Sequence, residues 1–309
     1  MCGIAGFFDK QANASAPVGK ILLSMLTPLG RRGPDSAGAA LYGDPQGFVV
    51  RVKLGERGDL GARAAEVVER ARALTRVTAS QVQDHFLRLA LEAIGDVRAL
   101  EAALEVVHPD VEVVSAGRRL EIVKELGAPI NLETTFGLSL FTGTHGIGHT
   151  RLSTESRVDL SHSQPFWAHG TLDLALVHNG HITNYHKLRR RYEQRGVRFY
   201  TENDSEVVGV YLADHMAQGL GFEEALRASL KDLDGSFSYL AATAEAFGYA
   251  KDPFCLKPLI VAETDEFVAV ANEEIALSAT FERKLETREP SNRQIRAWFL
   301  PRRSRRKVA

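Results

Sequence analysis

Cys2 is the first residue whose type and position could do chemistry. It lies between Met1 and Gly3, and excision of methionine before a small residue would leave one residue with both a thiol and a free α-amino group. An α-amino pKa of roughly 7.7 to 8.0 suits a general base near neutral pH, and the thiolate is the most nucleophilic ordinary side-chain species. Cys2 could therefore be a nucleophile that its own amine activates. The alternative is that a cysteine here is an accident of the start codon.

The second cysteine and the histidines give weaker evidence for a reactive or metal-binding site. Cys255 has apolar neighbours and is predicted to be a packed thiol, and the absence of a C-x-x-C pair argues against a zinc or redox motif. Ten histidines include two groups at close spacing, His145 with His149, and His178 with His181 and His186. A zinc site would need further ligands around an open position, so we expect no metal.

Composition limits the partners. The chain has 309 residues, 44% of them hydrophobic, which is enough for a sizeable core. Its 38 Lys and Arg against 39 Asp and Glu give a formal net charge of -1, so no global field favours nucleic acid or a membrane. No stretch approaches the roughly 18 apolar residues of a membrane helix, and the start lacks the features of a signal peptide. We therefore expect a cytoplasmic protein.

The pattern of the chain predicts a mixed fold with strands at both ends. Strands and turns are predicted for the first 55 residues, a helical insertion for about 61–107, strands for 136–141, 146–150 and 172–177, and helices for 183–195 and 206–216. Asp204 or Ser205 could cap the last of these helices. Four antiparallel strands are predicted for 237–242, 248–250, 259–262 and 267–271.

Several short motifs surround the polar residues in a fixed order. They are Met1-Cys2-Gly3-Ile4-Ala5-Gly6, Arg31-Arg32-Gly33-Pro34-Asp35-Ser36, Gly148-His149-Thr150-Arg151-Leu152-Ser153-Thr154, Val177-His178-Asn179-Gly180, Asn203-Asp204-Ser205-Glu206, Lys257-Pro258-Leu259 and Ala271-Asn272-Glu273-Glu274. In this order they resemble the class-II glutamine amidotransferases, over about residues 2 to 280 without the insertion.

The resemblance implies a fold and a domain division. The expected fold is α+β, a four-layer αββα sandwich of the N-terminal-nucleophile hydrolases with two antiparallel sheets, here with a helical insertion. The amidotransferase domain would span residues 2–285, with the insertion at about 61–107, and residues 286–309 would form a C-terminal extension with a basic tail. That tail is expected to be a solvated end rather than a nucleic-acid contact.

The resemblance also implies a reaction. Cys2 would attack the side-chain amide carbon of glutamine, release ammonia and leave a γ-glutamyl thioester that water hydrolyses. The Asn179 side-chain amide and the Gly180 backbone amide resemble the oxyanion hole, which needs aligned donors. The alternative for Asn179-Gly180 is an ordinary type I′ turn.

Further residues resemble the family's substrate-binding set. A specific site must pair both charges of free glutamine, because a buried charge without a partner is costly. Arg151 resembles the residue that binds the α-carboxylate, and Asp204 resembles the acceptor of the α-ammonium group. Arg32 and Gly33 resemble a loop over the bound glutamine, and Thr154 lies where the family contacts the carboxylate end.

We expect no second domain that would consume ammonia, because only about thirty residues follow the last motif. Its overall likeness is to stand-alone amidotransferase subunits of glutamate-synthase-like assemblies, including the N-methylglutamate synthase type. The expected partners are L-glutamine and larger synthase subunits in a hetero-oligomer, with FMN and iron–sulfur clusters on those subunits and no cofactor in this chain. The alternatives are a non-catalytic glutamine-sensing or docking subunit, a free-standing glutaminase, or an amidohydrolase of the same fold that acts on another amide.

Overall fold

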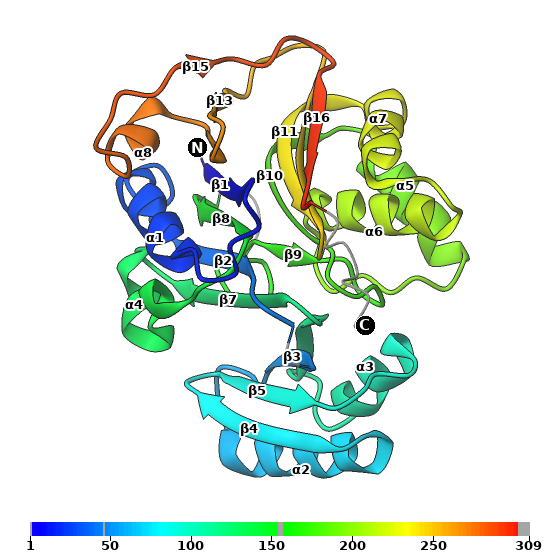
Figure 1. Ribbon diagram of the computed structural model, residues 1–309. Coiled ribbons are helices and arrows are strands. Elements are labelled where there is room, and N and C mark those ends of the chain that lie inside the picture. The colour runs from blue at the N-terminus through cyan, green and yellow to red at the C-terminus, as the bar shows by residue number, and fades with distance from the viewer. Residues whose placement is uncertain (1, 46, 154–156, 302–309) are drawn as a thin grey trace, which may run out of the picture.

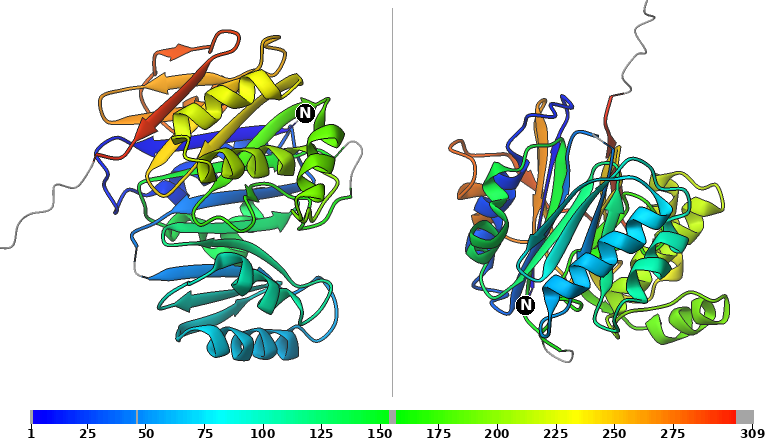
Figure 2. Two further views of the ribbon diagram at one scale, coloured as in Figure 1. Left: turned by 90° about the vertical axis from the view of Figure 1, so that its right-hand side faces the viewer. Right: turned by 90° about the horizontal axis from the view of Figure 1, so that it is seen from below.

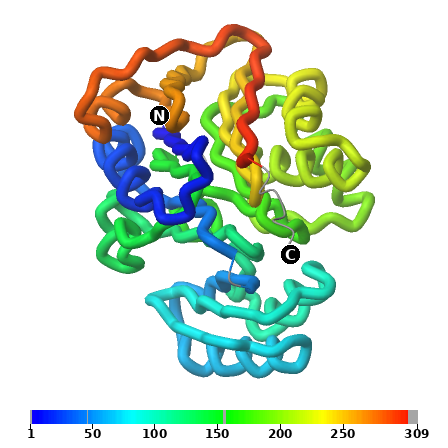
Figure 3. The backbone as a smooth tube through the Cα atoms, in the orientation of Figure 1, coloured from blue at the N-terminus to red at the C-terminus, as the bar shows by residue number. Residues whose placement is uncertain are grey.

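The N-terminal strand lies at the centre of the molecule. The computed structural model describes residues 2–45, 47–153 and 157–301. Strand β1 (Gly3–Asp9) is buried from Gly3 to Phe8 and pairs on one side with β8 (His145–Arg151) and on the other with β14 (Phe267–Ala271). Figure 3 shows this blue N-terminal segment beside the orange segment from near the other end of the chain.

Two antiparallel sheets form the body of the protein (Figure 1). The seven-stranded sheet has the order β15-β13-β14-β1-β8-β2-β7, and its further strands are β2 (Ser36–Tyr42), β7 (Leu120–Leu126), β13 (Ile260–Glu263) and β15 (Thr287–Arg288). The five-stranded sheet has the order β16-β12-β11-β10-β9, with β9 (Phe166–Trp167), β10 (Ala175–Ile182), β11 (Gly235–Ala242), β12 (Ala246–Lys251) and β16 (Ile295–Phe299).

Helices cover the outer face of each sheet. On the seven-stranded sheet lie α1 (Val18–Leu29), α4 (Ile130–Phe136), the short 3₁₀ helix η1 (Leu138–Leu140) and α8 (Glu274–Ser278). On the five-stranded sheet lie α5 (Tyr185–Gln194), α6 (Asp204–Ala217) and α7 (Phe222–Asp232). The inner faces of the sheets meet around β1, β8, β10 and β11, so side chains of both sheets share one apolar core.

The predicted strands near the C-terminus are confirmed as β11, β12, β13 and β14. The strand predicted for 136–141 is wrong, because α4 and η1 occupy that stretch. Gly137 separates the two helices with φ 63°, a left-handed conformation that suits glycine and ends α4. Leu138 is buried beside this turn, which explains the apolar signal without a strand.

The insertion is not purely helical, which corrects the prediction for 61–107. Residues 48–117 form β3 (Phe48–Lys53), α2 (Leu60–Leu74), β4 (Val77–Gln83), β5 (Phe86–Leu91), α3 (Val97–Glu105) and β6 (Glu112–Gly117). The strand order β4-β5-β3-β6, antiparallel throughout, is that of the split βαβ motif, and this subdomain lies at the lower edge of the molecule in Figure 1 and in the left view of Figure 2.

The sequence of β5 explains why this stretch is predicted as helix. Leu87, Leu89 and Leu91 alternate and are buried, which is a strand period, but the surrounding Ala, Leu, Glu and Arg residues favour helix. Strand β4 is an edge strand whose residues are mostly exposed, so it carries almost no hydrophobic signal.

The C-terminal segment belongs to the sheets and is not a separate extension from residue 286. Strand β15 pairs with β13, and β16 pairs with β12 over Ile295–Phe299. Trp298 is buried against Phe247 and Tyr249, and β16 forms the edge strand of the five-stranded sheet. The basic run from Arg302 lies outside the described residues. Within the described ranges, no helix is long and apolar enough to cross a membrane.

Candidate functional site

Cys2 stands at the start of β1, half-buried, with its Sγ 3.7 Å from the carbonyl oxygen of Leu152. Asn272 fixes this end of the strand, because its Nδ2 donates to the Cys2 carbonyl at 3.1 Å and its Oδ1 accepts from the Ile4 amide at 3.0 Å. Asn272 belongs to the motif Ala271-Asn272-Glu273-Glu274, but the motif by itself does not predict its hydrogen bond to Cys2. These two hydrogen bonds fix the backbone of Cys2 at the start of β1.

The Cys2 carbonyl oxygen also accepts from Asn179 Nδ2 at 3.3 Å and from Arg32 Nε at 3.4 Å. Arg32 forms an ion pair with Glu273, and it is not among the described residues that line the hollow around Cys2. Gly33 packs so closely that a Cβ would lie 2.4 Å from the backbone of Thr150. The structure therefore puts the Arg32-Gly33 loop against the backbone beside Cys2.

A hollow of about 880 Å³ opens at Cys2. It contains Cys2, Arg151, Asn179, Gly180 and Asp204 among its lining residues. Cys2 directly precedes β1 and the other four belong to β8, β10 and α6, so residues far apart in the sequence meet in one place. Thr154 lies outside the described residues.

Asn179 and Gly180 lie inside β10, not in a turn. The strand pairs with β11 without a register shift from Ala175 to Ile182, which removes the type I′ alternative. Gly180 has φ 141°, and a Cβ there would lie 2.2 Å from the carbonyl oxygen of Ser236. Only glycine fits this backbone.

The backbone amide of Gly180 faces the open edge of β10. On this edge the His178 amide donates to Gln164 Oε1 at 2.6 Å, and the Ile182 amide donates to Asp204 Oδ2 at 2.7 Å. Backbone amides alternate sides along an antiparallel strand, so the Gly180 amide points the same way. Strand β9 pairs with β10 only at Ala175 and Leu176, so it does not pair with the Gly180 amide.

Arg151 and Asp204 supply opposite charges to the hollow. Arg151 ends β8, is buried, and donates from Nη1 to the carbonyl of Arg157 at 2.8 Å. Asp204 is the first residue of α6, but the N-cap is Asn203, whose side chain accepts from the Ser205 amide at 3.0 Å. The predicted cap at Asp204 or Ser205 is therefore one or two residues late, and the Asp204 carboxylate accepts from the Ile182 amide.

The neighbouring histidines are neutral packing groups. Burial lowers the pKa of His149 to about 3 and also lowers the pKa of His178, so neither carries charge near neutral pH. His178 Nδ1 lies 2.8 Å from Ser205 Oγ, and this hydroxyl accepts from Gln164 Nε2 at 3.2 Å. The result is a polar network beneath Asn179.

Potential metal ligands gather elsewhere in the described part of the chain. One group of three, Glu101, Glu105 and His169, brings ligand atoms within 4.8 Å of one another. None of the three lines the hollow at Cys2.

Cys255 is exposed, which corrects the prediction of a packed thiol. It has φ 56° in a turn where Asp252 Oδ1 accepts from the amides of Phe254 and Cys255, and its Sγ lies 3.7 Å from the carbonyl oxygen of Asp252. Lys257, just beyond it, lines the hollow at Cys2, but Cys255 is not among the described lining residues.

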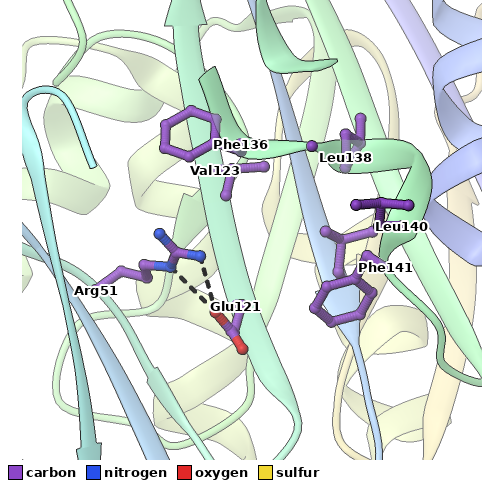
Figure 4. A pocket seen from close by; sticks show the side chains of 9 residues that line it. Arg51, Glu121, Val123, Phe136, Leu138, Leu140 and Phe141 are labelled. Carbon is purple, nitrogen blue, oxygen red and sulfur yellow. Dashed lines mark hydrogen bonds and ion pairs between the residues drawn. The ribbon is translucent and has the colours of Figure 1, made fainter. Parts of the chain in front are cut away.

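A second hollow, of about 210 Å³, lies between the inserted subdomain and the core (Figure 4). Apolar side chains such as Phe136 and Leu140 form its walls, and the ion pair of Arg51 with Glu121 lies beside them. The described lining contains no nucleophile, so this hollow is not the candidate catalytic site.

Comparison with known proteins agrees with this geometry. A family model for a glutamine amidotransferase domain matches residues 149–279. The chain is 40% identical over 283 residues to the glutamine amidotransferase-like protein GlxB of Rhizobium meliloti, covering 90% of this chain and 91% of the relative. It is 29% identical over 165 residues to the amidophosphoribosyltransferase of Methanocaldococcus jannaschii, covering 53% of this chain and 35% of that protein.

Among solved structures, the glutamine phosphoribosylpyrophosphate amidotransferase of B. subtilis matches with a TM-score of 0.61 at 18% identity. The match covers 98% of this chain and 50% of the solved chain, so the present chain spans about half of that protein. At this identity the likeness concerns the fold alone.

Proposed function

The chain belongs to the class-II glutamine amidotransferases, and from this premise we propose that it hydrolyses L-glutamine to glutamate and ammonia through Cys2. The observation that carries the proposal is the shared hollow, where a thiol, a buried guanidinium, a carboxylate and two amide donors meet. Each has a counterpart on glutamine or on its tetrahedral intermediate.

Substrate binding would use the two charges. The Arg151 guanidinium can pair with the α-carboxylate of glutamine, and the Asp204 carboxylate can accept from the α-ammonium group. Both charges stand on ordered backbone, Arg151 at the end of β8 and Asp204 at the start of α6. Together they favour a free amino acid over an amide that lacks these groups.

The covalent step would use Cys2 as nucleophile and base. The α-amino group takes the thiol proton, and the sulfur forms a bond to the amide carbon. The Asn179 side chain and the Gly180 amide stabilise the oxygen that becomes negative. The carbon–nitrogen bond breaks as the leaving nitrogen takes the proton from the α-ammonium group, and water then hydrolyses the thioester to glutamate.

We further propose that the ammonia passes to a separate synthase subunit, of the glutamate-synthase or N-methylglutamate synthase type. FMN and iron–sulfur clusters would then belong to those subunits. The chemical support is that free ammonia is protonated in water near neutral pH, so a protected path to a second site keeps it reactive. A non-catalytic sensor would need the glutamine-binding charges but not the thiol.

The test of the hydrolysis is labelling with the glutamine analogue diazo-oxo-norleucine. We expect one adduct on Cys2 by intact mass and peptide mapping, loss of Met1 in the active protein, and no glutamate release by Cys2→Ala. Cys255→Ala is the matched control and should label and turn over as the wild type does. Full activity of Cys2→Ala, or an adduct on Cys255, would refute the proposal.

The test of the partner is the rate of glutamate release by the isolated chain and by its assembly. We expect slow release alone, co-purification with larger synthase chains, and faster release when the acceptor substrate is added. A chain that turns over at its full rate and never associates in pull-downs would leave a free-standing glutaminase.

A further inference from the structure

The inserted subdomain, residues 48–117, reaches the walls of the Cys2 hollow through two buried polar links. One link ends on the segment that leads into Asp204, and the other ends on the segment that follows Arg151. The first segment runs directly into Asp204, and the second supplies the Arg157 carbonyl that accepts from Arg151, so the contacts of both with the subdomain bear on substrate binding.

The first link centres on Tyr200. Its hydroxyl lies 2.7 Å from Glu101 Oε1 and 2.9 Å from Glu105 Oε2, and both buried carboxylates belong to α3 of the subdomain. The Tyr200 ring stacks on His169 with centroids 3.8 Å apart, and the Arg198 guanidinium lies 4.5 Å from the ring centroid. Tyr200 is thus held at its hydroxyl and at its ring.

Tyr200 is continuous with the wall of the hollow. Its amide donates to Glu206 Oε1 at 2.7 Å, and the amide and hydroxyl of Thr201 both donate to Glu206 Oε2 at 2.9 Å. The Thr201 hydroxyl accepts from the amide of Asn203 at 3.1 Å. Residues 202–205, which include Asp204, all line the hollow and lie between these anchors.

The second link centres on Glu112 of β6. Within the subdomain its Oε2 lies 2.9 Å from Lys53 Nζ, and it accepts from the hydroxyl of Ser161 at 2.5 Å. The Leu160 amide donates to Glu56 of the subdomain at 3.3 Å. The Arg157 carbonyl that holds Arg151 belongs to the same segment, so this link braces the guanidinium.

A third contact fixes the subdomain to the core itself. Glu121 of β7 accepts from Arg88 Nε at 2.8 Å and from Arg51 Nε at 3.1 Å, beside the hollow of Figure 4. The subdomain is therefore anchored on the seven-stranded sheet and extends to both charged walls of the site.

We propose that the inserted subdomain sets the affinity for glutamine by positioning Asp204 through Tyr200 and Arg151 through Glu112. Tyr200, Glu101, Glu105 and Glu112 are then positioning residues, since none of them lines the hollow among the described residues. The inference rests on the proposed glutaminase function and adds a regulatory surface to it, because any contact that moves α3 moves the anchor of Tyr200.

The experiment compares Tyr200→Phe with Tyr211→Phe. Tyr211 lies on α6 and its hydroxyl donates to Asp232 at 2.6 Å, so both variants lose a tyrosine–carboxylate contact, but only Tyr200→Phe loses one that reaches the subdomain. We expect the glutamine KM of Tyr200→Phe to rise about fivefold, the order of one such bond, with little change in kcat. Tyr211→Phe should keep the wild-type KM.

A binding readout separates positioning from general loosening. Iodoacetamide alkylates Cys2 without needing the α-carboxylate or α-ammonium clamps, and bound ligands protect the thiol. Tyr200→Phe should lose protection by L-glutamine about fivefold but keep protection by glutaramate, which lacks the α-ammonium group that Asp204 binds. Glu112→Gln, which weakens the brace on Arg151, should lose protection by both ligands.

The outcomes are distinct. Equal loss of protection by both ligands in Tyr200→Phe, or a KM within twofold of the wild type, would overturn the positioning role. If L-glutamine fails to protect Cys2 in the wild type, the proposed function fails first, and the subdomain has no glutamine affinity to set.

Discussion

Asn179 and Asn272 both donate their side-chain amides to the carbonyl oxygen of Cys2, at 3.3 and 3.1 Å. Asn179 also lines the hollow where substrate would bind, but Asn272 is not among the described lining residues. The two amides therefore hold the same residue from positions with different access to the reacting atoms, and this difference can be tested.

Asn179→Ala should lower kcat by about 10² to 10³ and change the glutamine KM little, because its bond to the substrate strengthens only as the oxyanion forms. Asn272→Ala should lower kcat less, since Asn272 holds the backbone of Cys2 and Ile4 and is not among the described residues that line the hollow. Steady-state glutamate release measures both. A change in KM alone for Asn179→Ala would remove its oxyanion role.

Arg151→Ala and Asp204→Ala should each raise the glutamine KM by about tenfold or more, because each leaves one charge of the substrate without a partner. Arg31→Ala is the control, since Arg31 is exposed and is expected to be a surface charge. Initial rates over a range of glutamine concentrations measure the effect. An unchanged KM in both variants would show that glutamine binds elsewhere.

Gly180→Ala should destabilise the protein far more than Gly196→Ala and abolish turnover. Both glycines have positive φ, 141° and 82°, but a Cβ at Gly180 would meet the Ser236 carbonyl oxygen at 2.2 Å, while nothing lies within 4 Å at Gly196. Gly196→Ala should cost about 1 kcal/mol from backbone strain alone. Urea unfolding compares the two, and equal costs would mean that β10 tolerates a side chain at residue 180.

His145 should make the protein less stable as the pH falls. Burial lowers its pKa to about 3 from an ordinary value of 6.5, so between these pH values the unfolded chain binds a proton that the folded chain does not. The stabilising contribution is complete above pH 6.5 and is lost as the pH drops, by up to about 1.4 kcal/mol per pH unit.

His145→Gln removes this one titration and isolates it from other groups, including His162, whose pKa is raised by its hydrogen bond to Asp159 and acts in the opposite direction. The free energy of unfolding from urea titrations at pH 7 and 5.5 should fall less in the variant than in the wild type. An equal or larger fall in the variant would contradict the buried neutral state.

The predictions from sequence succeeded where a local pattern carries the information. Cys2, Arg151, Asn179, Gly180 and Asp204 were selected from short motifs, and the structure brings all five to one hollow. The strands near the C-terminus were also predicted, because their alternation and tight turns are local features. In contrast, the residues of the edge strand β4 are mostly exposed, so its sequence lacks the hydrophobic alternation that predicts a strand.

Only the tertiary structure decided which distant residues hold these groups in place. Asn272 meets the Cys2 carbonyl across 270 positions of the chain, and Tyr200 meets Glu101 across 99. It also decided that Asn179-Gly180 continues a strand, because β11 supplies its pairing partners. Side-chain hydrogen bonds and strand pairing between remote segments depend on how the chain packs, and no local period or motif of the sequence encodes them.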